Sequence, residues 1–188
     1  EPWSFGEEAN RIFKKFADLR YSLLPYIVTE ANYCAKNAIP MMKAMVLEAE
    51  DDINTYCIED QYMFGRFILV APVLESMEKT NKRKVYLPKG IWFDYWTKKK
   101  IKSQGSWIET DVTIETIPIF IKNGSILVYK KENAVNTEES IYPIDKIESY
   151  GKDAVYTVSD SNVEKKIQVK KGVLISPENG NITYILFN

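Results

Sequence analysis

Apolar residues recur at steps of three and four over the first part of the chain, which is the spacing of one face of an α-helix. The main stripe consists of Ile12, Phe16, Leu19, Leu23 and Ile27. Ser4 and Glu7 have the spacing of a capping box, so we expect a helix to start there. Pro25 lies inside the pattern and predicts a kink or a break near Tyr21, and Asn37 predicts the end of the helical segment.

Beyond Pro40 the pattern changes to short apolar runs separated by turn residues. Residues 41–47 predict a strand buried on both faces, residues 56–63 a short helix, and residues 67–73 a second buried run. Shorter strands are expected at 83–87, 91–96, 107–110, 117–122, 125–129, 154–158, 165–169, 173–176 and 182–187. Asn123-Gly124 predicts a type I′ hairpin, and Asn179-Gly180 predicts another turn. Helices followed by antiparallel strands predict an α+β fold that is mainly β.

A polar stretch at residues 130–140 predicts a boundary between two parts of the chain. The helical segment carries a broad apolar face that needs a large partner. Because the sequence does not begin with methionine, we expect it to be an internal or C-terminal piece of a longer chain, whose preceding portion covers that face.

Composition excludes several classes of function. The 188 residues are 45% apolar and carry a formal net charge of −1, which argues against a nucleic-acid or membrane-surface binder. No apolar run approaches the roughly 18 residues of a membrane span. The chain contains no histidine, so a Ser-His-Asp triad, a Cys-His dyad or a His-ligated zinc site cannot form within it. Cys34 and Cys57 lie among apolar neighbours and predict two buried thiols in a reducing, cytoplasmic setting.

Two groups of acidic residues are candidates for acid–base or metal chemistry. They comprise Glu48, Glu50, Asp51 and Asp52, and the pair Glu59 and Asp60. A calcium-binding register starting at Asp52 fails, because Tyr56 occupies its fifth place and the required glycine is lacking. A solvated loop explains the same residues better. The sequence itself therefore predicts no catalytic residue, no metal site and no cofactor.

An aromatic set is the most suggestive feature for ligand binding. It comprises Trp92, Phe93, Tyr95, Trp96 and Trp107. Flat indole faces stack on sugar rings, so Trp92, Trp96 and Trp107 are candidate sugar contacts. Strand alternation places Trp92 and Trp96 on one face and Phe93 and Tyr95 on the other. One face must pack in the core, so at most half of the set is available, and a core role is favoured.

Seven segments, in the same order, resemble the C-terminal part of glycoside hydrolase family 31, the α-glucosidase and α-xylosidase family. They are residues 1–6 (EPWSFG), 19–27 (LRYSLLPYI), 40–45 (PMMKAM), 60–65 (DQYMFG), 68–73 (ILVAPV), 85–97 (VYLPKGIWFDYWT) and 117–127 (IPIFIKNGSIL). The resemblance covers about residues 1–130 and fades beyond them.

The resemblance implies a domain organisation and a role. Residues 1–64 would be the C-terminal elements of a catalytic (β/α)8 barrel, with 41–47 as its final strand. Residues 65–130 would be a proximal β-sandwich, and 131–188 a shortened distal one. In this family two aspartates on the barrel carry out retaining hydrolysis of terminal α-linked sugars. Both lie on segments that precede Glu1, so the resemblance implies that this chain alone is inactive and that its partner is the barrel.

Two other functions remain open from the sequence. The first is a carbohydrate-binding module that acts through Trp92, Trp96 and Trp107. The second is a self-associating scaffold, possible as a homo-oligomer, because an unpaired helix stripe would expose more apolar surface than monomers tolerate. For the role implied by the resemblance and for both of these alternatives, the expected binding partner is an oligosaccharide or another protein surface.

Overall fold

The computed structural model describes residues 1–130, 144–160, 163–175 and 182–188. Its first elements are a 3-10 turn, η1 (Pro2–Phe5), and two α-helices, α1 (Glu7–Ser22) and α2 (Leu24–Asn37). The helical segment breaks beside Pro25, as predicted, because proline cannot donate to the preceding turn. The predicted capping box is wrong. Ser4 lies in the 3-10 turn, and the N-cap of α1 is Gly6, whose φ of 95° lets the chain turn into the helix.

Beyond α2 the described chain is mainly β-structure, arranged in four sheets, as predicted. In order across the largest sheet, the strands are β1 (Met42–Ala44), β2 (Tyr62–Phe64), β3 (Ile68–Val70), β8 (Ile119–Lys122), β5 (Gly90–Asp94) and β6 (Lys100–Ser103). A separate two-stranded ribbon pairs β4 (Lys82–Leu87) with β7 (Ser106–Asp111).

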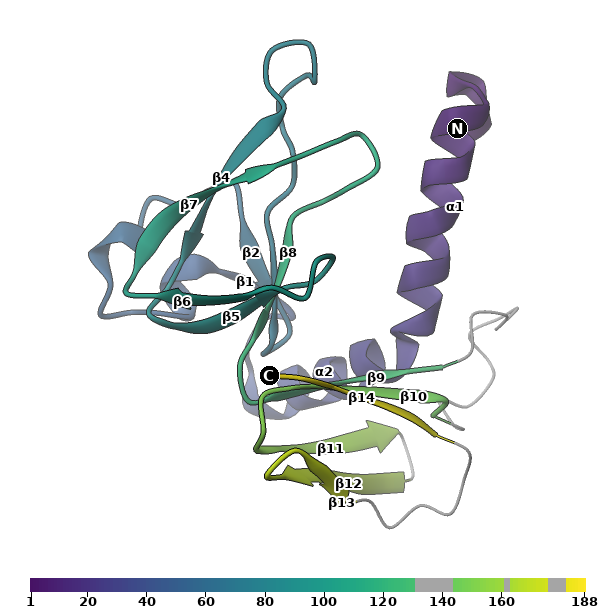
Figure 1. Ribbon diagram of the computed structural model, residues 1–188, viewed down its shortest axis with the longest axis vertical. Helices are drawn as coiled ribbons and strands as arrows, with labels where there is room; N and C mark the ends of the chain where they lie inside the picture. Colours follow the sequence, from purple (N-terminus) through teal and green to yellow (C-terminus); the bar gives the residue numbers. More distant parts are fainter. Residues whose placement is uncertain (131–143, 161–162, 176–181) are drawn as a thin grey trace.

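Two three-stranded sheets follow. One has the order β14 (Thr183–Phe187), β10 (Lys146–Tyr150) and β9 (Ser125–Tyr129), and the other joins β11 (Ala154–Asp160), β12 (Val163–Lys170) and β13 (Val173–Ile175). Ladders within all four sheets are antiparallel except the pairing of β10 with β14, which is parallel and departs from the prediction. Figure 1 shows these two sheets in the lower half of the molecule and the ribbon and the six-stranded sheet in the upper half.

The six-stranded sheet is covered on both faces. Trp92, Met63 and Phe120 pack with the inner face of the β4–β7 ribbon in one hydrophobic core. Phe93 and Ile121 belong to a second core. That second core continues through β9–β12 to helix α2, so it unites the upper and lower halves of the molecule.

Several local predictions are wrong for identifiable reasons. Residues 41–47 form not a buried barrel strand but the three-residue edge strand β1 and a 3-10 turn, and Met42 is 58% exposed. Residues 56–63 contain no helix; a 3-10 turn at Ile53–Thr55 precedes strand β2, and Cys57 is exposed rather than buried. Cys34 is buried, as predicted.

The turn at Asn123-Gly124 does not close a hairpin. β8 pairs with β3 and β5, whereas β9 pairs with β10, so the turn carries the chain from one sheet to another. A type I′ turn requires a positive φ at both of its central residues. Gly124 has a φ of 81°, but Asn123 is not among the residues with positive φ. Strands β6 and β10 were not predicted. The expected linker over 131–140 and the turn at Asn179-Gly180 lie outside the described residues.

Helix α1 leaves much of its apolar surface uncovered. Figure 1 shows it projecting from the end of α2 with the N-terminus at its tip. Phe16 packs edge-on against Trp96, at 6.0 Å between ring centroids. Trp3 is 64% exposed, Phe5 80% and Phe13 55%. Leu23 of the main stripe is buried and its other members, from Ile12 to Ile27, are partly buried, whereas the exposed aromatic side chains lie beside that stripe and before it. Neither described helix is both long enough and apolar enough to cross a membrane.

Candidate functional site

A cleft of about 650 Å3 brings the predicted acidic loop against three strands. The loop over residues 47–54 forms one wall, and Tyr86 of β4, Trp92 of β5 and Lys122 of β8 contribute to the rest. The cleft collects carboxylates, lysines and aromatic edges, so it is the place to look for acid–base chemistry in this chain.

The side chain of Asp52 is held by a hydrogen-bonded cluster in the cleft. Its Oδ2 accepts the phenol proton of Tyr86, and its Oδ1 accepts from Asn54 Nδ2 at 2.9 Å. The Tyr86 hydrogen bond, followed by those from Asn54, lowers the pKa of Asp52 below its ordinary value. Gly105 closes over this cluster with a φ of 84°, and a Cβ there would lie 3.0 Å from Tyr86 Oη and 3.2 Å from Asp52 Oδ2.

Glu48 is committed to two lysines. Its side chain is 8% exposed and forms ion pairs with Lys43 at 2.7 Å and Lys122 at 2.5 Å. A glycosidase general acid needs a carboxyl group with a raised pKa. In the described residues, every carboxyl group whose pKa departs clearly from its ordinary value is shifted downward. The described part of the chain also holds no cluster of three or more Cys, Asp or Glu side chains placed to bind a metal.

Removing the Tyr86 hydroxyl should be visible in the titration of Asp52. In Tyr86→Phe we expect the pKa of Asp52 to rise, because the largest cause of its depression is gone. Stability from a depressed carboxyl pKa is present above the ordinary value of about 3.9 and is lost as the pH falls through the folded value. The stability difference between the two proteins should therefore shrink in acid. Carbon NMR titration of Asp52 measures the shift, and an unchanged pKa would contradict this account.

Tyr56→Phe is the matched control for that titration. Its hydroxyl donates to Glu50 O at 2.9 Å in the same loop and is not among the groups that shift the pKa of Asp52. The variant should leave the pKa of Asp52 unchanged.

The structure does not bring the three candidate sugar-contact tryptophans to one platform. Trp92 is 1% exposed in the core, and its Nε1 donates to Pro88 O at 2.9 Å. Trp96 follows β5, is half-buried against α1, and donates to Ile117 O at 2.7 Å. Trp107 lies on β7 and is 51% exposed. Sugar contact at these residues stays a prediction, and Trp107 is the one with an open indole face.

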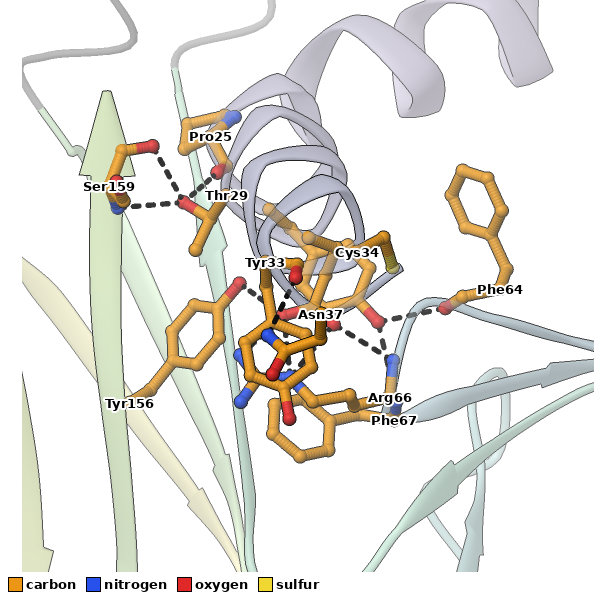
Figure 2. A network of polar contacts seen from close by, with 12 residues as sticks. Pro25, Thr29, Tyr33, Cys34, Asn37, Phe64, Arg66, Phe67, Tyr156 and Ser159 are labelled. Atoms are coloured by element: carbon orange, nitrogen blue, oxygen red, sulfur yellow. Dashed lines mark hydrogen bonds and ion pairs between the residues drawn. The ribbon is translucent and has the colours of Figure 1, made fainter. Parts of the chain in front are cut away.

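A buried ion pair that the sequence analysis missed ties α2 to the sheets. Glu30 of α2 is fully buried and forms a two-point pair with Arg66, with Nη2–Oε1 at 2.8 Å and Nε–Oε2 at 3.0 Å. Tyr156 of β11 donates to Glu30 Oε1 at 3.0 Å, and the Arg66 guanidinium lies 3.8 Å from the centroid of the Tyr33 ring. Figure 2 shows Tyr33, Arg66 and Tyr156 gathered beside α2.

The same network extends along α2 through two further contacts. The Tyr26 hydroxyl donates to Phe64 O at 2.8 Å, and Thr29 Oγ1 accepts from Ser159 N at 3.1 Å (Figure 2). Helix α2 is thus fixed both to the β2–β3 turn and to strand β11. One feature of the sequence could have indicated this buried ion pair. Glu30 is a charged residue that lies one helical turn after Tyr26 and Ile27, on the buried side of the helix.

A second buried carboxylate links the upper and lower halves. Glu148 of β10 is 4% exposed and accepts from the hydroxyls of Tyr129 and Tyr150, each at 2.7 Å. Lys98, from the turn after β5, reaches it at 3.4 Å and lies 4.2 Å from the Tyr95 ring centroid. Burial lowers the pKa of Lys98. All of these partners of Glu148 belong to this chain, so the cluster is explained by its role in holding the two halves of the molecule together.

Comparisons with known proteins assign the family. A profile described as the TIM-barrel domain of glycosyl hydrolases family 31 matches residues 1–30, and one described as the family 31 C-terminal domain matches residues 38–127. The α-xylosidase of Saccharolobus solfataricus is 36% identical over 163 residues, which are 86% of this chain and 22% of that protein. Alpha-glucosidase 2 of Bacillus thermoamyloliquefaciens is 39% identical over 127 residues, 68% of this chain and 16% of the relative.

A solved structure agrees with these matches. A family 31 dextranase of Flavobacterium johnsoniae, solved in complex with isomaltotriose, superposes with a TM-score of 0.81 at 30% identity, covering 99% of this chain and 26% of that one. The chain belongs to glycoside hydrolase family 31. It spans about a fifth of the length of the curated relatives it matches.

Proposed function

We propose that this chain is the C-terminal, structural portion of a retaining α-glycosidase that hydrolyses terminal α-linked glucose or xylose from oligosaccharides. The catalytic aspartates belong to a (β/α)8 barrel outside these residues, and the chain shapes and stabilises that barrel. The similarity to an α-xylosidase and an α-glucosidase supports this substrate class. We also propose a cytoplasmic setting, which the free thiols of Cys34 and Cys57 support.

The observation that carries the proposal is the open apolar surface of η1 and the first turns of α1. The residues that match the family's barrel domain include η1 and α1, and the exposed side chains Trp3 and Phe5 of η1 and Phe13 of α1 form no part of either hydrophobic core of the described residues. Large apolar side chains gain about 1.5–3 kcal/mol each on full burial, so this surface favours a permanent protein partner. A barrel in the same polypeptide or complex is that partner.

We further propose three parts: closing barrel elements, a proximal sandwich, and a distal sandwich that takes in β9 as well as residues 131–188, because β9 pairs with β10. The sequence prediction put the first boundary after residue 64. Because β2 pairs with β3 across that point, and the C-terminal profile begins at residue 38, we now favour a boundary near Pro40. The proximal part then holds the six-stranded sheet and the β4–β7 ribbon.

The test compares the chain alone with a whole relative. The purified 188-residue chain should release no 4-nitrophenol from 4-nitrophenyl α-glucoside or 4-nitrophenyl α-xyloside. Release of 4-nitrophenol by this chain would contradict the proposal. In the Saccharolobus solfataricus α-xylosidase, deletion of the corresponding segment should abolish activity and soluble expression, and grafting this chain in its place should restore both. A truncated relative that kept its activity and melting temperature would show that the segment is not a supporting part.

A further inference from the structure

A second hollow, distinct from the acidic cleft, opens beside the β4–β7 ribbon. It encloses about 450 Å3 between the ribbon, the segment that follows β3, and Asp60. Binding sites for small molecules fall in the range of roughly 300–1,000 Å3. Its lining carries three carboxylates and three cationic side chains, namely Asp60, Glu75 and Glu109 and Lys82, Arg83 and Lys84. The balanced charge favours a neutral ligand with many hydrogen-bonding groups over an anion or a cation.

Trp107 gives this groove an exposed aromatic face. Its side chain lines the groove and is 51% exposed, whereas the ring of its cross-strand partner Tyr86 is 1% exposed. The two rings pack edge to face at 5.3 Å between centroids. Tyr86 is itself fixed, because its backbone N donates to Gln61 Oε1 at 2.8 Å. The Trp107 indole therefore packs against a side chain whose position is fixed.

Within the described part of the chain, the indole N–H of Trp107 is available to a ligand. Trp92 and Trp96 each donate to a backbone carbonyl, but no described residue accepts a hydrogen bond from Trp107 Nε1. A half-exposed indole with an unused donor offers both an apolar face and a polar edge.

The polar rim of the groove is preorganised. Arg83 is 12% exposed, pairs with Asp60 at 2.9 Å and donates from Nε to Pro72 O at 3.0 Å, which fixes the segment after β3 against the ribbon. Lys82 and Glu109 form a half-exposed pair at 2.8 Å across the ribbon. These groups hold their positions without a ligand, so little ordering cost remains for binding.

We propose that this groove binds a short α-linked oligosaccharide, with one sugar ring stacked on Trp107 and its hydroxyls directed to the carboxylates and ammonium groups of the rim. A pyranose combines an apolar C–H face with neutral hydroxyls, which matches a flat indole inside a charge-balanced rim. The choice of α-linked sugars rests on the proposed function; the choice of a saccharide rests on the groove.

The experiment follows the indole N–H signals of the 15N-labelled full chain during titration with maltotriose, isomaltotriose and β-linked cellotriose. Substitutions to phenylalanine assign the four signals. Saturable movement of the Trp107 signal by an α-linked trisaccharide, at a dissociation constant of about 1 mM, is expected for one stacked ring in an open groove. Lys84→Ala, read on the same signal, should weaken binding about threefold or more, and Trp107→Ala, read by saturation transfer to the sugar, should weaken it at least about tenfold.

Trp96→Phe, which leaves the groove intact, should bind like the unmodified chain. Retained binding in Trp107→Ala, or movement of another indole signal alone, would overturn the assignment to this groove. No response to any sugar would overturn the saccharide proposal and leave the proposed function to its own deletion test. A response to cellotriose alone would overturn the α-linked choice and leave the proposed function to its own deletion test.

Discussion

Arg66→Ala is expected to lower the free energy of unfolding by about 3 kcal/mol. The substitution leaves the fully buried carboxylate of Glu30 without its cation, and breaking a buried pair from one side costs roughly 3–5 kcal/mol. We take the lower end because the Arg66 side chain is 29% exposed, so water can reach the site, and because Tyr156 still donates to Glu30. Urea-induced unfolding monitored by circular dichroism measures the loss.

Arg66→Lys separates charge from geometry in that network. An ammonium group supplies the positive charge but not two parallel N–H donors or a planar surface for Tyr33, so stability should fall between the alanine variant and the unmodified chain. Lys36→Ala is the control. The side chains of Lys36 and its partner Glu164 are 72% and 59% exposed, so loss of this ion pair should lower the free energy of unfolding by less than about 0.5 kcal/mol. Equal losses for Arg66→Ala and Lys36→Ala would contradict the importance of burial.

Gly65→Ala is expected to cost about 2–5 kcal/mol. Gly65 has a φ of 67°, a conformation that costs a residue with a Cβ roughly 1–2 kcal/mol. The new Cβ would also lie 2.5 Å from Tyr26 Oη and 2.8 Å from Glu30 Cγ, and overpacking of this kind costs about 1–3 kcal/mol more. Equilibrium unfolding in urea gives the total.

Gly124→Ala isolates the backbone part of that cost. Its φ is 81°, but a Cβ there meets nothing nearer than Asp153 O at 3.8 Å. We expect a loss of only about 1–2 kcal/mol. The difference between the two glycine variants measures the clash with the α2 network, and a difference near zero would show that Tyr26 and Glu30 move aside freely.

The periodic elements were predictable from the sequence, whereas their partners were not. Pro25 marked the break between the helices because its effect is local. Strand alternation correctly separated Trp92 from Phe93, but no local signal told that both faces of β5 are covered, one by the β4–β7 ribbon and the other by the core shared with α2. The same holds for Asn123-Gly124: the turn was recognisable, and the sheet that each flanking strand joins was not.

The candidate sites show the same limit. The sequence identified the acidic loop and the tryptophans as suggestive, but exposure alone distinguishes Trp107 from Trp92, and exposure is a tertiary property. The pair between Glu30 and Arg66 joins residues 36 positions apart, and the Tyr156 contact adds a partner 126 positions away. Such pairings follow from the completed fold and leave no periodic trace in the chain.

The contact between α2 and β11 has a consequence for the order of folding. Thr29 and Ser159 are 130 positions apart, so the helix meets this strand only after most of the polypeptide has left the ribosome. Closing so long a loop is slow, and surface awaiting a distant partner is open to aggregation in the meantime. The buried side of α2 that faces β11 is therefore exposed throughout synthesis of the intervening strands, and the docking of β11 is a late event in maturation of this protein.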